Sequence, residues 1–553
     1  MSARRETLAA CVGSVVAAAV MKAPALRDPG HRIPADLVDP LYQTWQLAWG
    51  AHAVTSAPLS PWDANVFWPL PHSLAFGDSL YGYSPLGVLF GSGPTAALVR
   101  YSVLFVLAYA LAAAGAYLLA RQLGCRPLAA SVAAAAYAFA PWHLSHDGHL
   151  NVLSNGGIPL CLALLARGHG VGGRGAPGPV RPACILAGWA VAAWQLTLGF
   201  AVGLQFVYLL GAIGLGAVAL VVTGRWRPPA GRGRAVLAAN LAGLALFAAV
   251  GLALATTYYG VAEAHPQAER RVSDLKFFSP PLSAFLVPPA TSTLWEGTYK
   301  AARGRLVWPT EQAMGVGAVL VVLAGYGLLR GDWSRRRRVG LAVTAGTLLL
   351  LGAGTTVADG RLFLLLFDYA PGWRSVRTPG RLVILVTLAL ALLAANGADR
   401  FRRRSRWPRV IGVALVGLVL LDGHGSLATP RVPAPSPGLA AAADPVLVLP
   451  SDDRADMQAM WASSDGFPRI VNGVTGFTPA TLAEARRRTV AFPDPASVAY
   501  LRELGVRSVV LRPAVARGTP WAGVAARSVS GLGVTVRPVG GDLVYDLAPP
   551  PPG

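Results

Sequence analysis

Long uninterrupted apolar runs dominate this sequence and limit what the chain can fold into. The stretches 235–258 and 314–329 are two of them. A helix needs about 20 mostly apolar residues to cross a hydrocarbon core of roughly 30 Å. Only helices and closed barrels satisfy their own backbone in lipid, and these runs lack the alternation of barrel strands. The runs therefore predict membrane-spanning helices.

The charge of the chain supports this interpretation. Only 14% of the 553 residues are charged, whereas soluble domains carry about 25%. The net charge of +21 is typical of nucleic-acid-binding proteins, but much of the arginine lies in short clusters between apolar runs, at 225–234, 335–338 and 400–409. Such clusters are typical of cytoplasmic loops. We expect membrane lipid as a partner and no nucleic acid.

The apolar runs predict about eleven spans. If the N-terminus is cytoplasmic, the dense arginine clusters all fall inside, and the odd count places the C-terminus outside. The sequence thus predicts a multi-pass protein of the cell membrane with an extracytoplasmic C-terminal domain. The predicted spans are 8–25, 97–120, 128–142, 154–167, 183–198, 201–222, 235–258, 313–329, 339–357, 380–397 and 410–427.

The predicted fold class is an α-helical polytopic membrane protein with a small C-terminal exoplasmic α/β domain. Residues 446–449, 508–511, 533–536 and 543–545 have the character of strands, and 479–489 and 495–504 that of helices. The acids Asp452, Asp453 and Asp456 favour a solvated turn after the first strand. The predicted boundaries are a membrane domain at 1–428 with long outer loops 26–96 and 259–312, a Pro-rich linker at 429–440, the α/β domain at 441–547 and a disordered tail at 548–553.

The first outer loop contains acids among aromatic residues. Asp39-Pro40 precedes Trp45 and Trp49, which share one face if this segment is a helix. Asp39 is then either the helix N-cap or a catalytic carboxylate near the membrane surface. The local sequence favours the cap, and one residue can do both.

Further along this loop, Asp63, Asn65 and Asp78 also lie among aromatic residues. Aromatic faces and carboxylates suit a sugar ring, whose CH face stacks while its hydroxyls donate hydrogen bonds. Aromatic residues at a membrane interface are also ordinary anchors.

Two clusters near other predicted span ends have two interpretations each. His143, His146 and His149 are spaced to share a helical face and bind a divalent ion, but Gly148 interrupts such a helix and favours a polar turn. Arg374, Arg377 and Arg381 lie at an outer mouth, against the positive-inside rule. They either grip a lipid phosphate or extend to the headgroups.

These residues together resemble a known family. The motifs are Asp39-Pro40 before Trp45 and Trp49, residues 64–69 (ANVFWP), Gly77-Asp78, residues 138–141 (AFAP) before His149-Leu150, and 374–381, with 471–477 and 504–510 near the C-terminus. The chain resembles bacterial polytopic glycosyltransferases of the GT-C superfamily, close to little-characterised actinobacterial members. The likeness covers most of the chain, although each motif alone is weak.

The resemblance implies transfer of a sugar from a polyprenyl-phosphate donor to a cell-envelope glycan or protein acceptor at the outer face. It implies Asp39 as base or metal ligand, with Asp36 and Asp78 as reserves, because the superfamily often has adjacent acids there and this loop does not. Arg377 or Arg381 would contact the carrier phosphate. The chemistry requires no soluble cofactor; a divalent cation is compatible with it, and no residue is assigned as a metal ligand. The candidate substrate-binding residues are Gln43, Trp45, Asp63, Asn65, His146, His149, Arg374, Arg377 and Arg381.

Two other functions remain open. One is a transporter or flippase for a lipid-linked glycan, although no clear internal repeat or mid-helix charge favours it. The other is a catalytically silent envelope scaffold, which sequence alone does not exclude.

Overall fold

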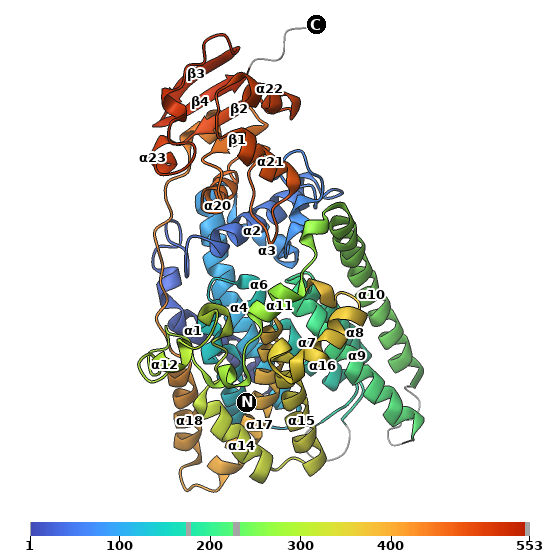
Figure 1. Cartoon of the computed structure of the whole chain (residues 1–553). Helices are drawn as coiled ribbons and strands as arrows, with labels where there is room; N and C mark the ends of the chain where they lie inside the picture. Colours follow the sequence, from blue (N-terminus) through green and yellow to red (C-terminus); the bar gives the residue numbers. More distant parts are fainter. Residues whose placement is uncertain (1, 173–177, 225–232, 548–553) are drawn as a thin grey trace. The chain divides into compact units, whose positions relative to one another are not determined.

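The chain divides into two compact units, neither of them continuous in sequence. The computed structural model describes residues 2–172, 178–224 and 233–547 (Figure 1). The predicted tail at 548–553 and most of the basic segment 225–234 lie outside the described residues. Unit 1 comprises Met1–Pro24, Leu104–Leu254 and Arg270–Leu427, and unit 2 comprises Ala25–Val103, Ala255–Glu269 and Ala428–Gly553.

Most of the apolar helices belong to unit 1, and they make this a multi-pass membrane protein. The helices of unit 1 are α1 (Ala3–Met21), α5 (Pro127–Ala138), α6 (Leu150–Leu153), α7 (Gly157–Gly168), α8 (Pro182–Leu196), α9 (Phe200–Val222), α11 (Val272–Phe278), α12 (Lys300–Arg303), α13 (Pro309–Gln312), α14 (Ala318–Arg330), α15 (Arg335–Gly352), α16 (Arg361–Tyr369), α17 (Val383–Arg403) and α18 (Pro408–Asp422), with most of α4 (Pro94–Gln122) and of α10 (Gly233–Ala264).

The predicted count of about eleven spans is not confirmed. Within the described part of the chain, five helical segments are long and apolar enough to cross a membrane: Pro94–Gln122, Leu150–Gly168, Phe200–Val222, Gly233–Ala264 and Pro379–Arg403. Two more apolar helices, α8 and α14, are shorter. The predicted span 128–142 contains only the short α5, because Pro141 begins the short 3₁₀ helix η5 (Pro141–His146). At the start of α15, four consecutive arginines interrupt the apolar character.

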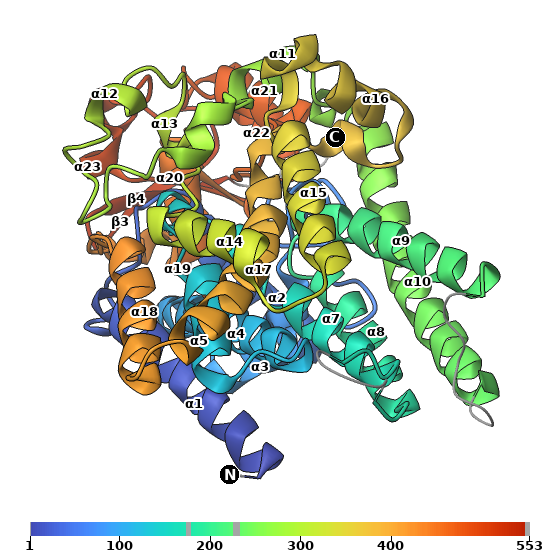
Figure 2. The same ribbon diagram turned by 90° about the horizontal axis from the view of Figure 1, so that it is seen from below.

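Helix α17 is the centre of unit 1 and packs against α14, α15 and α5 (Figure 2). Its contact with α14 depends on glycine. A Cβ at Gly327 would lie 1.9 Å from the carbonyl oxygen of Leu393, and one at Gly397 would lie 2.6 Å from that of Leu323. The two backbones therefore touch where side chains are missing, which is how helices associate in lipid.

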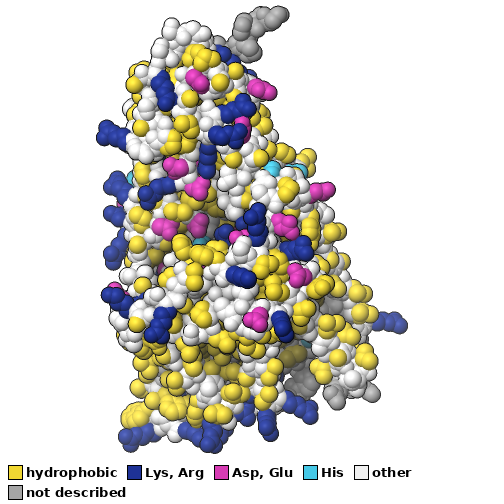
Figure 3. Space-filling view, viewed as in Figure 1, with side chains coloured by type: hydrophobic (Ala, Val, Ile, Leu, Met, Phe, Trp, Pro, Cys, Tyr) yellow, Lys and Arg dark blue, Asp and Glu magenta, His cyan; other side chains and the backbone are white. Residues whose placement is uncertain are grey.

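Basic side chains gather at one end of unit 1, where α14 joins α15 and α17 joins α18 (Figure 3). Arg335–Arg338 open α15, and Arg400, Arg402 and Arg403 close α17. This grouping is the distribution expected of a cytoplasmic end. The orientation of the chain in the membrane stays a prediction.

Unit 2 contains a four-stranded sheet, which bears out the predicted C-terminal strands. The strand order is β1-β2-β4-β3, with β1 and β2 parallel and the other pairs antiparallel. Apolar side chains occupy both faces of β1 and β2, so both strands are fully buried. The elements here are α2 (Asp39–Ser56), α3 (Ser84–Gly87), α19 (Pro437–Ala441), β1 (Val446–Leu449), α20 (Asp453–Ala462), α21 (Ala480–Arg488), α22 (Pro495–Glu503), β2 (Ser508–Leu511), α23 (Pro513–Ala516), β3 (Val534–Val539) and β4 (Asp542–Leu547).

The predicted solvated turn after β1 is wrong, because Asp453 and Asp456 lie in the first turn of α20. Asp452 caps α20 by accepting from the backbone of Ala455, and Asp453 is exposed. Asp456 is fully buried, because the first turn of α20 directs it inward. Its carboxylate accepts from Asn472 Nδ2 at 2.6 Å and from Arg486 Nη2 at 2.9 Å. A buried ion pair therefore joins α20 to α21.

We predict that Asp456→Ala destabilises this part of unit 2 by about 3–5 kcal/mol, because the Arg486 guanidinium and the Asn472 amide lose their buried partner. Asp453→Ala removes the exposed carboxylate that also contacts Arg486 and should cost less than about 1 kcal/mol. The measurement is the rate of proteolysis within 441–547 in the full chain, compared between the two variants. Equal protection of both variants would contradict the prediction.

Candidate functional site

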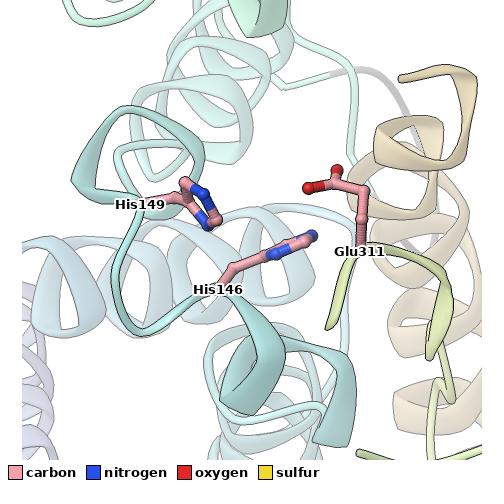
Figure 4. Close-up of side chains that lie close together, drawn as sticks. All are labelled: His146, His149 and Glu311. Atoms are coloured by element: carbon pink, nitrogen blue, oxygen red, sulfur yellow. The ribbon is translucent and has the colours of Figure 1, made fainter. Parts of the chain in front are cut away.

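Three titratable side chains of unit 1 converge on one point (Figure 4). His146 ends η5, His149 lies just before α6, and Glu311 belongs to α13. One ligand atom from each lies within 4.8 Å of the other two. The backbone here forms the predicted polar turn and not a continuous helix, since His149 N donates to the His146 carbonyl at 2.8 Å. That turn still brings the two rings together.

An ion pair holds this turn in place. Lys22 Nζ lies 2.7 Å and 2.9 Å from the two carboxylate oxygens of Asp147, and the Tyr109 hydroxyl donates to the same carboxylate at 2.5 Å. Both charged side chains are buried. Asp147 thereby fixes the backbone between His146 and His149.

Glu311 forms a second buried ion pair. Arg381, in the 3₁₀ helix η11 (Pro379–Leu382), donates from Nε to Oε1 at 2.8 Å and from Nη2 to Oε2 at 3.1 Å. Burial alone would raise the pKa of Glu311, but the charge and the hydrogen bonds of the Arg381 guanidinium lower it to about 2. The carboxylate is therefore ionised at neutral pH. This bidentate pair engages Arg381, one of the two candidates for the carrier phosphate.

The three side chains fit the donor set of a divalent metal ion. Both ring nitrogens of His146 are buried and make no hydrogen bond to residues that the structure describes. Burial, more than any neighbouring charge, lowers the pKa of His146 to about 3, so the imidazole is neutral. Neutral imidazole with carboxylate suits zinc and other first-row transition ions. An ion would share the Glu311 carboxylate with Arg381.

A cationic cluster lies elsewhere in unit 1. Arg377 stacks over the Phe278 ring, with its guanidinium carbon 5.2 Å from the ring centre. Burial lowers the pKa of Arg270, and the charge of Arg377 lowers it further, whereas Asp274 opposes the shift. The charge of Arg377 therefore reaches the Arg270 guanidinium. Arg374 is exposed.

The three acids named as candidate bases lie in unit 2. Asp36 Oδ1 accepts from the Val38 backbone at 2.8 Å, an ordinary turn contact. Asp39 begins α2, with Val38 as its N-cap residue and no side-chain cap, so the predicted cap is wrong. Burial raises the pKa of the Tyr42 hydroxyl, and the charges of Asp78 and Asp39 raise it further. Asp39 and Asp78, far apart in sequence, thus share the surroundings of Tyr42.

Gly77 and Gln46 shape this acidic cluster. A Cβ at Gly77 would lie 2.5 Å from the Tyr42 hydroxyl, so only glycine leaves room for that ring. Gln46 donates from its side chain to the Asp78 carbonyl, and the Tyr258 hydroxyl donates to the Gly77 carbonyl at 3.0 Å. The backbone that carries Asp78 is therefore held on both sides.

Other candidate substrate-binding residues of unit 2 have structural contacts. Trp45 Nε1 donates to Asn65 Oδ1 at 3.0 Å, and Asn65 Nδ2 donates to Ser463 Oγ at 3.0 Å. Trp45 and Asn65 are buried, as is Gln43. Asp63 is exposed and accepts from the His72 backbone at 2.8 Å. Trp45 and Asn65 connect α2 to the segment after α20.

Sequence reasoning missed three residues of these clusters: Glu311, Lys22 and Arg270 in its role beside Arg377. Glu311 was visible as an acid in Trp308-Pro309-Thr310-Glu311 just before an apolar run. No pattern connected it to histidines more than 160 residues earlier, because the contact depends on packing and not on spacing.

Comparisons with known proteins give a family and a fold. A family model described as "Domain of unknown function (DUF6311)" matches residues 33–422. The sequence search found no match among curated proteins. The arabinofuranosyltransferase AftD from Mycobacteria is similar in structure, with a TM-score of 0.52 and 17% identity over 99% of this chain and 40% of AftD. This chain therefore spans about two fifths of the length of AftD.

Two further solved structures resemble this one more distantly. They are the apo oligosaccharyltransferase of Archaeoglobus fulgidus (TM-score 0.47, 12% identity, 91% of this chain and 69% of that one) and apo ArnT of Cupriavidus metallidurans (TM-score 0.38, 15% identity, 97% of each). The likeness to AftD shows the fold of the polytopic GT-C glycosyltransferases, as the sequence resemblance predicts.

We predict that Glu311→Gln destabilises the protein by about 3–5 kcal/mol, because it leaves the Arg381 guanidinium buried without its counter-charge. The double variant Glu311→Leu/Arg381→Met should recover most of that loss. Unfolding of the full chain in mixed micelles with a rising fraction of denaturing detergent measures both. Exposed Glu296, changed to Gln, is the control. Additive losses in the double variant would show that the pair does not stabilise unit 1.

Proposed function

This chain belongs to the family described as a domain of unknown function, DUF6311, and because it has the GT-C fold we propose that it is a glycosyltransferase. It takes a sugar from a polyprenyl-phosphate donor and transfers it to a hydroxyl of a cell-envelope acceptor at the outer face of the membrane. The observation that carries the proposal is that the charges of Asp39 and Asp78 both act on the Tyr42 hydroxyl in unit 2. Two carboxylates near one point can serve as a base and the group that orients it.

The reaction is a single displacement. The acceptor oxygen forms a bond to the anomeric carbon while the bond from that carbon to the carrier phosphate oxygen breaks. The hydroxyl proton passes to Asp39, and the phosphate leaves with both electrons of the broken bond. Asp78 is the reserve for the base, and the turn contact of Asp36 makes it the weaker candidate.

The carrier phosphate requires cations, and we propose that Arg377 and Arg270 bind it. The charge of Arg377 acts on Arg270, and a guanidinium fork matches phosphate oxygens. Arg374 is exposed and three residues from Arg377, and in this proposal it contacts the same headgroup. Arg381 is already paired with Glu311 and has a positioning role, since it fixes α13 against the start of α17.

A divalent cation at His146, His149 and Glu311 is compatible with this function. Bound there, it would supply positive charge of the kind that stabilises a leaving phosphate. The Lys22–Asp147 and Arg381–Glu311 ion pairs hold these three side chains in fixed positions relative to one another.

The first test measures sugar transfer. In membranes containing the full chain, supplied with a panel of radiolabelled polyprenyl-phosphate pentoses and hexoses, we expect transfer from one donor. Asp39→Asn should lower its rate by about 10²- to 10⁴-fold, the usual contribution of a general base. Asp28→Asn is the matched control, because Asp28 is a half-buried acid of the same loop whose ion-pair contacts are with His31 and Arg32.

Each outcome of this test has one meaning. Transfer that survives Asp39→Asn but not Asp78→Asn moves the base to Asp78. Transfer that survives both variants refutes the paired-carboxylate mechanism. No transfer from any donor, with folded protein present, favours the transporter or the scaffold.

The second test measures metal binding without reference to activity. The full chain in detergent is titrated with Co²⁺, and the visible absorption of the bound ion is recorded. We expect binding that His146→Ala weakens by at least about ten-fold, because a ligand contributes no less than the second-shell groups that orient it. His424→Ala, an exposed histidine of unit 1, should bind as wild type does. Equal affinity of wild type and His146→Ala would show that these residues hold no ion.

A further inference from the structure

A cavity of about 230 Å³ in unit 2 lies apart from the acidic cluster around Tyr42. It is formed by one face of α2, the loop before α4 and the segment after α20, and we call it the Arg100 cavity. Its volume is below the roughly 300 Å³ at which pockets for drug-sized molecules begin. There is room for about one ring-sized ligand. The side chains used in the argument are Arg100, His52, Thr55, Ser92 and Phe467.

Arg100 gives the cavity its charge. The side chain is 2% exposed, and it forms no ion pair with a carboxylate among the residues that the structure describes. Its Nε donates to the Gly87 carbonyl at 2.9 Å and its Nη2 to the Gly91 carbonyl at 2.5 Å. These contacts use two of its five N–H groups. A buried cation without a counter-charge is costly, so an anion that reaches it is favoured.

The loop at the cavity wall is built to present this guanidinium. Gly91 and Gly93 have φ of +80° and +87°, which side-chain-bearing residues rarely adopt, and a Cβ at either would meet nothing within 4 Å. The Gly91-Ser92-Gly93 turn therefore contacts the Arg100 guanidinium and leaves the cavity beside it open. Among the described residues, no carboxylate lines the cavity. Burial lowers the pKa of His52, so this ring is neutral at pH 7.

An aromatic pair forms another part of the wall. The rings of His52 and Phe467 are stacked, with centroids 4.3 Å apart, and Trp49 meets Phe467 edge-on at 5.5 Å. Phe467 has a φ of +52°, a conformation that costs a bulky residue energy. The surrounding contacts thus hold this ring at the cavity. A flat aromatic face beside a cation suits a sugar ring that carries a negative group.

A second cavity limits where such a ligand can lie. Phe467 also lines a neighbouring hollow of about 270 Å³, whose walls include Asp444 and Asp465. Asp444 is paired with Arg469 at 2.8 Å, so Asp465 is the carboxylate there that would repel an anion. The negative group therefore belongs on the Arg100 side of the Phe467 ring.

We infer that the Arg100 cavity binds a monosaccharide unit bearing one anionic group, either a carboxylate or a phosphate. The guanidinium of Arg100 binds the anionic group, and the stacked His52 and Phe467 rings contact the sugar ring. This binding does not depend on the proposed transfer reaction, because the cavity contains none of the residues assigned to it.

Binding to the full chain in detergent, measured by calorimetry, tests the inference. The probes are glucuronate and glucose 6-phosphate, with glucose and inorganic phosphate as comparators. We expect at least one of the two anionic sugars to bind about ten-fold or more tightly than glucose and than inorganic phosphate, as expected for a hydrogen bond to a charged group. The preferred probe identifies the anionic group.

Two variants remove the site in different ways. Arg100→Gln removes the charge, and Thr55→Trp fills the space from an exposed position on its rim. Each should weaken binding about ten-fold or more. Their controls are Arg507→Gln and Leu59→Trp, at exposed positions of unit 2 outside the cavity, which should bind as wild type does. If Arg100→Gln fails to fold, Thr55→Trp decides the result.

Three results would overturn the inference. The first is folded wild type that binds neither anionic sugar. The second is glucose or inorganic phosphate binding as tightly as the anionic sugars. The third is unchanged affinity in a folded Arg100→Gln or Thr55→Trp variant.

Discussion

Close contact between α14 and α17 is the constraint on which unit 1 depends. Lipid supplies little hydrophobic force between helices, so their association relies on tight packing of the backbones. Gly327 and Gly397 allow that approach, since a Cβ at either would overlap the facing helix. The position of α17 in turn fixes η11 at its beginning, and η11 carries Arg381 to Glu311. Helix packing therefore determines where the His146–His149–Glu311 group is assembled.

Buried charges are the second organising feature. Three buried cations differ in whether their partner is a carboxylate or a backbone carbonyl. Lys22 and Arg381 each meet a carboxylate within their own unit, Asp147 and Glu311. Both pairs convert a costly burial into a fixed geometry. Arg100 meets two backbone carbonyls and faces a cavity. The first two cations thus organise structure, and the third is the one whose surroundings suit a ligand.

The sequence predicts the features that repeat locally and misses those that depend on distant contacts. Apolar runs identified the membrane-spanning class, and alternation or short apolar runs located β1 and β2 residue for residue. The start of α22 at Pro495 was also predicted, because helix starts are decided within about four residues. Asp456 was misjudged and Glu311 overlooked because their partners, Arg486 and the two histidines, are neighbours only after folding. For Asp39, by contrast, a local rule predicted an N-cap and was wrong. Helix α2 begins at Asp39 itself, one residue earlier than an N-cap at that position would allow.

The Lys22–Asp147 pair has a consequence for how the chain is made. Its partners are 125 residues apart, so the lysine emerges during synthesis long before the aspartate exists. Until then, the ammonium group at the end of α1 has no carboxylate to neutralise it and must remain in contact with water or lipid headgroups. Helix α1 can reach its final depth only after the turn beyond α5 has been inserted. Biogenesis of unit 1 is therefore not strictly sequential, because α1 is among the last of its helices to reach its final position.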